Sequence, residues 1–169
     1  PPAVEAQTPE PAAPLQVLAR LALTMEMKKD FSVVLLAGGS GARMNPETLN
    51  QLPKQYLPLG CKRVIDYSLD TFLKYCTDII VVLPDPVSPP VPLPQRDEIR
   101  YVRGGSTRDA SIGNALAAGV RHERVLLHDA ARPFVTRKVI ASLLAELEWH
   151  DAACPVIPVV NSIVVDEDG

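Results

Sequence analysis

The stretch VVLLAGGSGARMNPETLNQLPKQY, residues 33–56, decides the fold. Its apolar start, with two valines, predicts a short buried strand over residues 31–36. Ala37-Gly38-Gly39-Ser40-Gly41 follows with almost no side chains, and its glycines allow a sharp turn and close approach of a ligand to the backbone. Successive N–H groups in such a loop form a concavity that binds anions. With Arg43 and Lys54 beyond it, the stretch is typical of a phosphate-binding site after a strand.

Two common nucleotide-binding motifs do not fit this loop. A P-loop requires Gly-Lys-Ser or Gly-Lys-Thr at its end, whereas Gly41 is followed by Ala42 and Arg43. The dinucleotide fingerprint requires a third glycine where Met44 stands. A plain strand-to-helix turn with solvated basic residues remains the alternative to a phosphate site.

Composition narrows the class of protein. A chain of 169 residues, 47% hydrophobic and 22% charged, is suited to one domain with a buried core. The net charge of −3 argues against general nucleic-acid binding, so a phosphate site must be local. The sequence contains no apolar run long enough for a membrane span. Three cysteines without Cys-x-x-Cys spacing indicate a cytosolic or otherwise reducing compartment.

Apolar periodicity predicts strands that alternate with helices. The expected strands are 31–36, 79–83, 99–102, 125–127, 152–159 and 162–165, and the expected helices are 64–75, 109–118 and 138–150. Residues 84–94 carry six prolines and exclude a regular helix. Residues 1–30 are expected to be a disordered or linker extension, with a short helix over 15–25.

This alternation predicts an α/β fold of Rossmann-like type, with a mostly parallel sheet and helices on both faces. Ligands of such sheets bind at the carboxyl ends of the strands. Three segments follow predicted strand ends, namely 38–43, 104–111 and 129–132. We therefore expect them to meet at one edge of the sheet.

Three motifs carry a resemblance to a known family. AGGSGARM (37–44) followed by LPKQYLPLG (52–60), then GGSTRDASIGNAL (104–116) and HDAARPFV (128–135), resemble the sugar-phosphate nucleotidyltransferases. Within these the chain is most similar to the 2-C-methyl-D-erythritol 4-phosphate cytidylyltransferases, over residues 31–169. The resemblance implies a nucleotidyltransferase fold in which CTP and a polyol phosphate react with Mg²⁺, and a homodimer for a complete chain.

The resemblance also implies roles for individual residues. Arg43 and Lys54 would stabilise the transition state, and Arg132 and Ser162 would bind the acceptor. Asp129 would lie near the ribose or acceptor and the metal ion. The remaining nucleotide-binding positions would be Ala37, Gly38, Gly39, Ser40, Gly41, Gly104, Gly105, Ser106, Arg108, Ser111 and Ala130. Among the residue-level alternatives, Asp129 could cap the turn before Pro133, and Lys54 and Arg108 could be solvated surface residues.

Family members continue beyond the position of Gly169 into a segment that completes the acceptor site. The sequence is therefore expected to be C-terminally incomplete, and to bind CTP with poor or absent turnover. A ribitol-5-phosphate cytidylyltransferase and a CTP-binding module without turnover are the alternatives to the methylerythritol phosphate enzyme. A cytoplasmic location is expected, or a plastid-type organelle if residues 1–30 are a targeting remnant.

Overall fold

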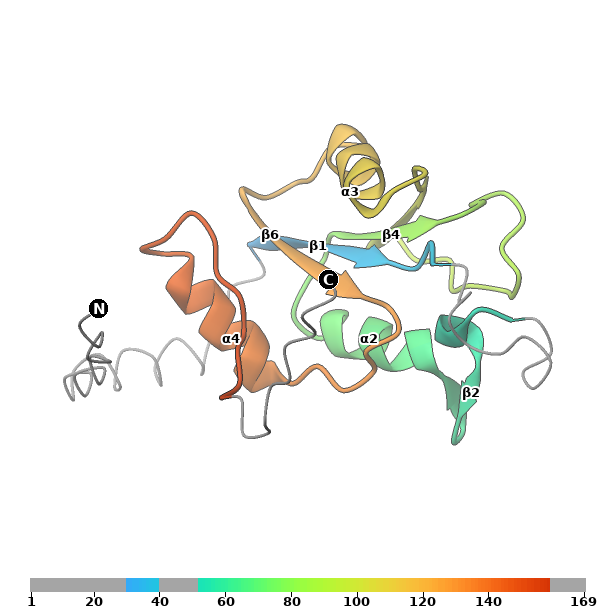
Figure 1. Cartoon of the computed structure of the whole chain (residues 1–169), viewed down its shortest axis with the longest axis horizontal. Coiled ribbons are helices and arrows are strands. Elements are labelled where there is room, and N and C mark those ends of the chain that lie inside the picture. The colour runs from blue at the N-terminus through green and yellow to red at the C-terminus, as the bar shows by residue number, and fades with distance from the viewer. Residues whose placement is uncertain (1–29, 40–51, 159–169) are drawn as a thin grey trace, which may run out of the picture.

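The computed structural model describes residues 30–39 and 52–158 (Figure 1). Outside these ranges lie the extension over 1–29, the segment 40–51 and the strand expected at 162–165. Four of the expected site residues also lie outside, namely Ser40, Gly41, Arg43 and Ser162. Their predicted roles stay predictions.

A parallel four-stranded sheet forms the centre of the molecule, in the order β5-β4-β1-β6. Strand β1 (Phe31–Leu36) pairs with β4 (Ile79–Leu83) on one side and with β6 (Arg124–Asp129) on the other. Strand β5 (Ile99–Arg103) pairs with β4. The mostly parallel sheet and the interior position of β1 confirm the predicted fold class.

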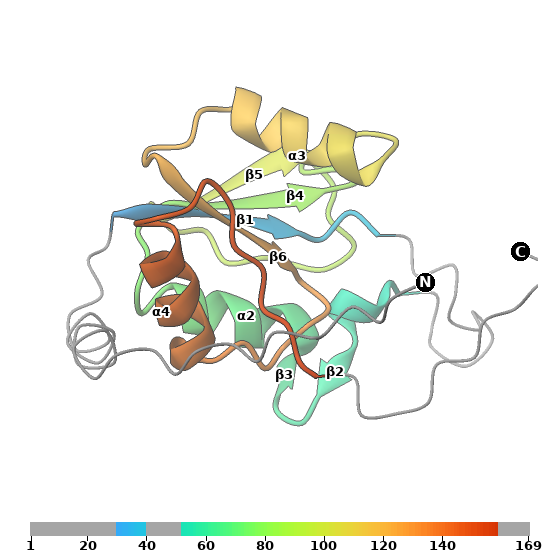
Figure 2. The same ribbon diagram turned by 60° about the vertical axis from the view of Figure 1, so that its left-hand side comes forward.

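Helices cover both faces of this sheet, as Figures 1 and 2 show. Helices α2 (Val64–Phe72) and α4 (Arg137–Glu146) lie on one face, and α3 (Arg108–Ala117) lies on the other. The alternation of side chains along β1 explains why, because Phe31, Val33 and Leu35 join the larger core cluster, whereas Val34 joins the cluster with Ala115 of α3.

Short elements that the periodicity did not predict lie between β1 and α2. A 3-10 helix, η2 (Lys54–Tyr56), leads into the antiparallel hairpin of β2 (Pro58–Leu59) and β3 (Lys62–Arg63). Gly60 adopts a φ of 62° at the turn, a conformation that suits glycine. This hairpin places η2 beside the end of β1.

The proline-rich connection between β4 and β5 contains no helix, as predicted. Its carbonyl groups accept hydrogen bonds instead, from Arg63 Nη1 to Pro92 O and from Tyr101 Oη to Pro94 O. Val91 and Leu93 pack against the main core. The crossover is therefore an ordered irregular segment.

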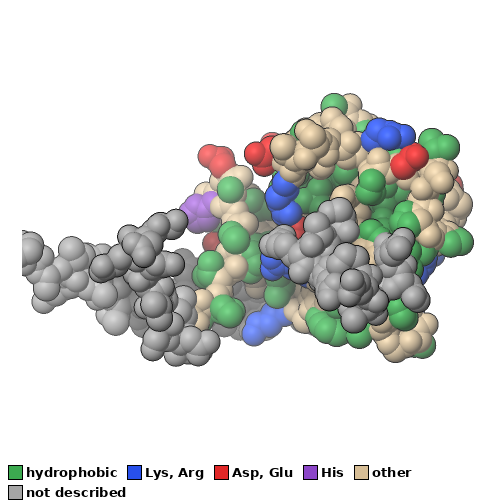
Figure 3. Space-filling view, turned by 45° about the vertical axis from the view of Figure 1, so that its right-hand side comes forward, with side chains coloured by type: hydrophobic (Ala, Val, Ile, Leu, Met, Phe, Trp, Pro, Cys, Tyr) green, Lys and Arg blue, Asp and Glu red, His purple; other side chains and the backbone are tan. Residues whose placement is uncertain are grey.

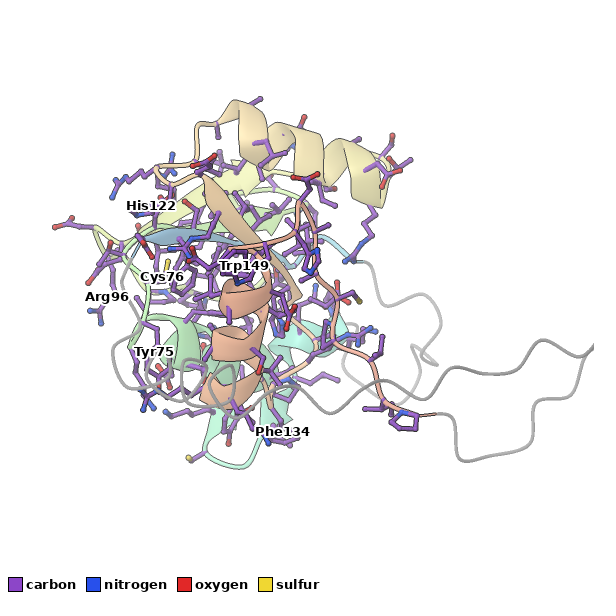
Figure 4. All side chains as sticks on the ribbon, turned by 90° about the vertical axis from the view of Figure 1, so that its left-hand side faces the viewer. Tyr75, Cys76, Arg96, His122, Phe134 and Trp149 are labelled. Carbon is purple, nitrogen blue, oxygen red and sulfur yellow. The ribbon has the colours of Figure 1, made fainter. Side chains whose placement is uncertain are left out.

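The strand predicted at 152–159 was wrong over its described part, because residues 152–158 have no regular structure. Pro155 and Pro158 have no N–H to donate to a sheet, and Val156 and Ile157 are 87% and 88% exposed. Helix α4 also ends earlier than predicted, and Trp149 lies exposed beyond its last turn (Figure 4).

A buried carboxylate fixes the amino-terminal edge of the sheet. Asp78, which precedes β4, accepts hydrogen bonds from Ser32 Oγ (2.6 Å), the Arg121 N–H (2.9 Å) and Arg100 Nη2 (2.7 Å). Its side chain is 1% exposed. Burial alone would raise the pKa of Asp78, but these hydrogen bonds and the charge of Arg100 hold the pKa below its usual value. Cys76 lies beside it under the sheet (Figure 4).

No helix in the described ranges is both long enough and apolar enough to cross a membrane.

Candidate active site

Backbone hydrogen bonds join three loops at the carboxyl ends of the strands. The Ala37 N–H donates to Val82 O (2.9 Å), the Gly104 N–H to Leu83 O (2.8 Å), and the Ala130 N–H to Leu36 O (3.0 Å). Each loop therefore begins against the end of a neighbouring strand. The structure confirms that segments far apart in the sequence meet at one edge of the sheet.

The first loop begins with Ala37, Gly38 and Gly39, the described part of the predicted phosphate-binding loop. Ala37 is buried, whereas both glycines are exposed, and a Cβ built on either would meet no atom of the described residues within 4 Å. Gln55 Nε2 donates hydrogen bonds to Ala37 O (2.7 Å) and Gly39 O (3.0 Å). Lys54, the first residue of η2, is exposed directly before that glutamine.

The second loop, Gly104–Thr107, needs small residues because α3 approaches it closely. A Cβ on Gly105 would lie 2.4 Å from Ala110 Cβ, and one on Gly104 would lie 3.1 Å from Ser111 Oγ. Ser111 Oγ accepts a hydrogen bond from the Gly105 N–H (3.1 Å) and donates one to Thr107 O (2.8 Å). Ser111 thus fixes the shape of the loop from the first turn of the helix.

A threonine side chain caps the start of α3. Thr107 is the N-cap, and its side chain accepts a hydrogen bond from the Ala110 N–H (3.1 Å). Arg108 is therefore the first helical residue, where a cation is unfavourable. The structure provides a carboxylate of the chain itself as the partner of Arg108.

That carboxylate belongs to Asp129, the last residue of β6, and it pairs with two arginines. Arg108 Nη1 contacts Asp129 Oδ1, and Arg132 Nε lies 3.0 Å from Asp129 Oδ2. Burial alone would raise the pKa of Asp129, but the hydrogen bonds and charges of these arginines hold the pKa below its usual value. The three side chains carry a net charge of about +1, which suits a bound anion.

The described residues do not fit a metal ion held by the protein alone. Both oxygens of Asp129 already accept hydrogen bonds from guanidinium groups. Within the described ranges no group of three or more His, Cys, Asp and Glu side chains could hold a metal ion. Figure 3, which brings the carboxyl ends of the strands toward the reader, shows basic and acidic side chains close together on this face.

Comparison with known proteins assigns the chain to a family. The model of "IspD: 2-C-methyl-D-erythritol 4-phosphate cytidylyltransferase" matches residues 31–169, which is most of the sequence. The chain belongs to the IspD family. The resemblance inferred from the three motifs is thereby confirmed.

Relatives of this IspD-family chain are longer than it is. It is 36% identical over 145 residues to the 2-C-methyl-D-erythritol 4-phosphate cytidylyltransferase of Cereibacter sphaeroides, an alignment covering 82% of the chain and 63% of the relative. It is 39% identical over 138 residues to the bifunctional enzyme IspD/IspF of Dinoroseobacter shibae, covering 79% of the chain and 34% of the relative. The chain thus spans between one third and two thirds of these relatives.

A solved structure gives the same result for the fold. The crystal structure of 2-C-methyl-D-erythritol 4-phosphate cytidylyltransferase from Thermus thermophilus superposes with a TM-score of 0.63 at 30% sequence identity. The match covers 81% of this chain and 59% of that one. The sheet and helices described above are therefore an IspD nucleotidyltransferase architecture.

In this IspD-family chain, two residues that the sequence did not single out support the Asp129–Arg132 turn. Ser68 Oγ, on α2, donates to Arg132 O (3.2 Å), and His128 Nε2 lies 2.9 Å from the same oxygen. The His128 ring also meets Phe72 edge-on, with 5.2 Å between centroids. Burial lowers the pKa of His128, partly offset by the hydrogen bond to Arg132, so the ring is neutral at pH 7 and donates its proton to that carbonyl.

The described IspD-family site therefore gathers most of the predicted positions. Ala130 is fully buried beneath the edge, and Ser106 is exposed in the second loop. The other described members lie in the three loops, in the first turns of α3, at the end of β6 or at the start of η2. No signal in the sequence marks Ser68, because its partner lies on a different element, and His128 lies in the HDAARPFV motif without a role of its own having been predicted.

Proposed function

We propose that this chain binds CTP in a cytidylyltransferase that transfers the cytidylyl group to 2-C-methyl-D-erythritol 4-phosphate and releases pyrophosphate. The observation that carries the proposal is the convergence of the three family motifs at one edge of the sheet. It is supported by the names of relatives that are 36% identical and of a solved structure with the same fold. The product would serve isoprenoid precursor synthesis by the non-mevalonate route.

The reaction needs orientation and charge neutralisation more than acid–base chemistry. The second pKa of a phosphate monoester is about 6, so the attacking oxygen of the acceptor is already ionised near neutral pH. It attacks the α-phosphorus of CTP, and the bond to the pyrophosphate oxygen breaks. Backbone N–H groups of the glycine-rich loop would bind the triphosphate, and Lys54 and Arg43 would meet the charge that develops at the α-phosphate.

The second loop would select the base. Gly104 and Gly105 lie against α3 with no room for a side chain, so the wall they form is made of backbone and Ser111. A pocket of that kind is too small for a purine and would leave the polar groups of a purine unpaired. Preference for CTP over ATP is therefore part of the proposal.

The acceptor would lie on the side of Arg132 and Asp129. Its phosphate carries two negative charges, and the guanidinium groups around Asp129 provide the positive ones. Mg²⁺ would reach the site bound to the triphosphate of CTP as part of the substrate, since such ions often keep substrate phosphates as ligands. We also propose that the complete protein is a homodimer and that it acts in the cytoplasm.

One experiment separates this function from its alternatives. CTP and ATP affinities are measured by calorimetry with Mg²⁺, and pyrophosphate release is followed with methylerythritol phosphate and with ribitol 5-phosphate. The proposal expects tighter binding of CTP than ATP, and release with methylerythritol phosphate alone. Equal affinity for CTP and ATP would refute it. CTP binding without release with either acceptor would favour a CTP-binding module.

A further inference from the structure

Gln55 connects the start of η2 to the glycine-rich loop. Its side chain is buried, with 2% of the residue exposed, although it directly follows the exposed Lys54. The amide nitrogen donates to Ala37 O at 2.7 Å and to Gly39 O at 3.0 Å. Because both partners are carbonyl oxygens, only the nitrogen of the amide, with its two protons, can satisfy both.

These two bonds determine where the loop's donors point. In a trans peptide the C=O and N–H groups of one plane point in opposite directions, and the described residues contain no cis peptide. Since Ala37 O is directed toward Gln55, the N–H of Gly38 is directed away from Gln55. Tyr56 Oη donates to the same Ala37 oxygen at 3.4 Å, which adds a second support.

Glycine needs such support more than other residues do. Gly38 and Gly39 have a wide range of accessible backbone conformations, and a Cβ on either would lie within 4 Å of no atom of the described residues. Among the described residues, no side chain packs closely enough to constrain the loop at these two positions. The Gln55 amide constrains it through the backbone, and it does so from the residue next to Lys54.

We propose that Gln55 is a positioning residue that holds residues 37–39, the described start of the phosphate-binding loop, with the Gly38 N–H available to an anion, and that it fixes these residues relative to Lys54. The inference rests on the proposed function, since it names the residue that shapes the same triphosphate site. Gln55 acts through the backbone of the loop and does not touch the substrate.

The test compares three variants with the wild-type chain. Gln55→Met keeps the length of the side chain and removes both donors, and Gln55→Asn keeps the amide but shortens its reach by one methylene. Ser32→Ala is the matched control, because it also removes a buried side-chain donor, but at the opposite edge of the sheet beside Asp78.

The first measurement needs no ligand. NMR order parameters of the Gly38 and Gly39 amides should fall in Gln55→Met, less so in Gln55→Asn, and stay unchanged in Ser32→Ala. Unchanged order parameters in Gln55→Met would overturn the inference, whether or not the chain binds CTP.

The second measurement divides CTP affinity by cytidine affinity for each variant. Loss of two hydrogen bonds that orient the loop should weaken CTP binding by about tenfold in Gln55→Met and leave cytidine binding unchanged, since cytidine carries no phosphate. An equal loss for both ligands would indicate a merely structural role and contradict the inference. If the wild-type chain binds no CTP, the proposed function fails, and the order parameters alone decide the role of Gln55.

Discussion

Arg108, the first residue of α3, is ion-paired with Asp129, the last residue of β6. The pair joins the second loop of the site to the turn that carries Arg132. It also places a carboxylate where the helix N-terminus and two guanidinium groups all favour negative charge. A phosphate entering this region therefore meets arginines that already have an anionic partner.

Replacement of Asp129 should make the arginines more available to an added anion. In Asp129→Asn we expect inorganic phosphate to bind up to about fivefold more tightly, because exposed ion pairs are worth at most about 1 kcal/mol. Calorimetry at low ionic strength measures the change. Asp70→Asn, which breaks an ion pair with Lys62, is the control and should leave the affinity unchanged. Weaker phosphate binding in Asp129→Asn would contradict the expectation.

Gly105 should not tolerate replacement by alanine, whereas Gly113 in the same segment should tolerate it. Gly105→Ala places a Cβ 2.4 Å from Ala110 Cβ, so the loop must move, and CTP affinity should fall by about tenfold or more. Gly113→Ala meets no atom within 4 Å and should stabilise α3 by about 1 kcal/mol. Binding calorimetry and urea denaturation of both variants check the pair of outcomes. Similar CTP affinities in the two variants would be inconsistent with a close-packed loop.

Lys54 should act in turnover more than in binding. In a complete enzyme that carries this segment, Lys54→Ala should lower the rate of pyrophosphate release about a hundredfold or more, because the ammonium group is proposed to meet charge that develops only in the transition state. CTP affinity should change much less. Lys74→Ala, an exposed lysine just beyond α2, is the matched control. Retention of the wild-type rate by Lys54→Ala would remove this lysine from the mechanism.

Asp78 should make the protein acid-sensitive. Its pKa in the folded protein lies below the ordinary value of 3.8, so its contribution to stability is complete above about pH 4 and is lost as the pH falls through the folded pKa. Asp78→Asn should lower the free energy of unfolding by on the order of 3 kcal/mol at pH 7. The difference in this free energy between the variant and the wild type should be smaller at pH 3. Urea denaturation at both pH values gives the comparison. Asp85 forms an exposed ion pair with Arg103 and is the control. Asp85→Asn should lower the free energy of unfolding by less than about 1 kcal/mol. If the difference in free energy of unfolding between the wild type and Asp78→Asn did not depend on pH, the ionised carboxylate of Asp78 would not be the stabilising form.

The centre of the sheet could be predicted because its two middle strands, β1 and β4, are almost purely apolar. Val33–Leu36 and Ile79–Leu83 have no polar side chain, which is typical of strands covered on both faces. The same criterion failed at residues 152–158, where the apolar content matches a buried strand but Pro155 and Pro158 remove backbone donors. A hydrophobic pattern is read from side chains alone, whereas the pairing of strands in a sheet requires backbone N–H groups.

The candidate site could be located from the sequence but not assembled from it. Glycine loops after strands indicate an edge, yet the link from Arg108 to Asp129 depends on how β6 and α3 are placed in space. Likewise, Ser68 and His128 share the carbonyl of Arg132 only because α2 packs below that turn. Hydrophobic periodicity does not report contacts between elements. It also does not report side chains that donate hydrogen bonds to backbone carbonyls.

The position of β1 in the sheet also has a consequence for synthesis of the chain. Phe31 is in register with Arg124 and Leu36 with Asp129, so the central strand is among the first described elements to emerge from the ribosome but receives its second neighbour only after Asp129 has been made. Contacts so distant in sequence slow folding, because the intervening chain must be ordered before they form. Until then an apolar strand has an unpaired edge in the nascent protein, and chaperone binding and aggregation compete with β6 for it.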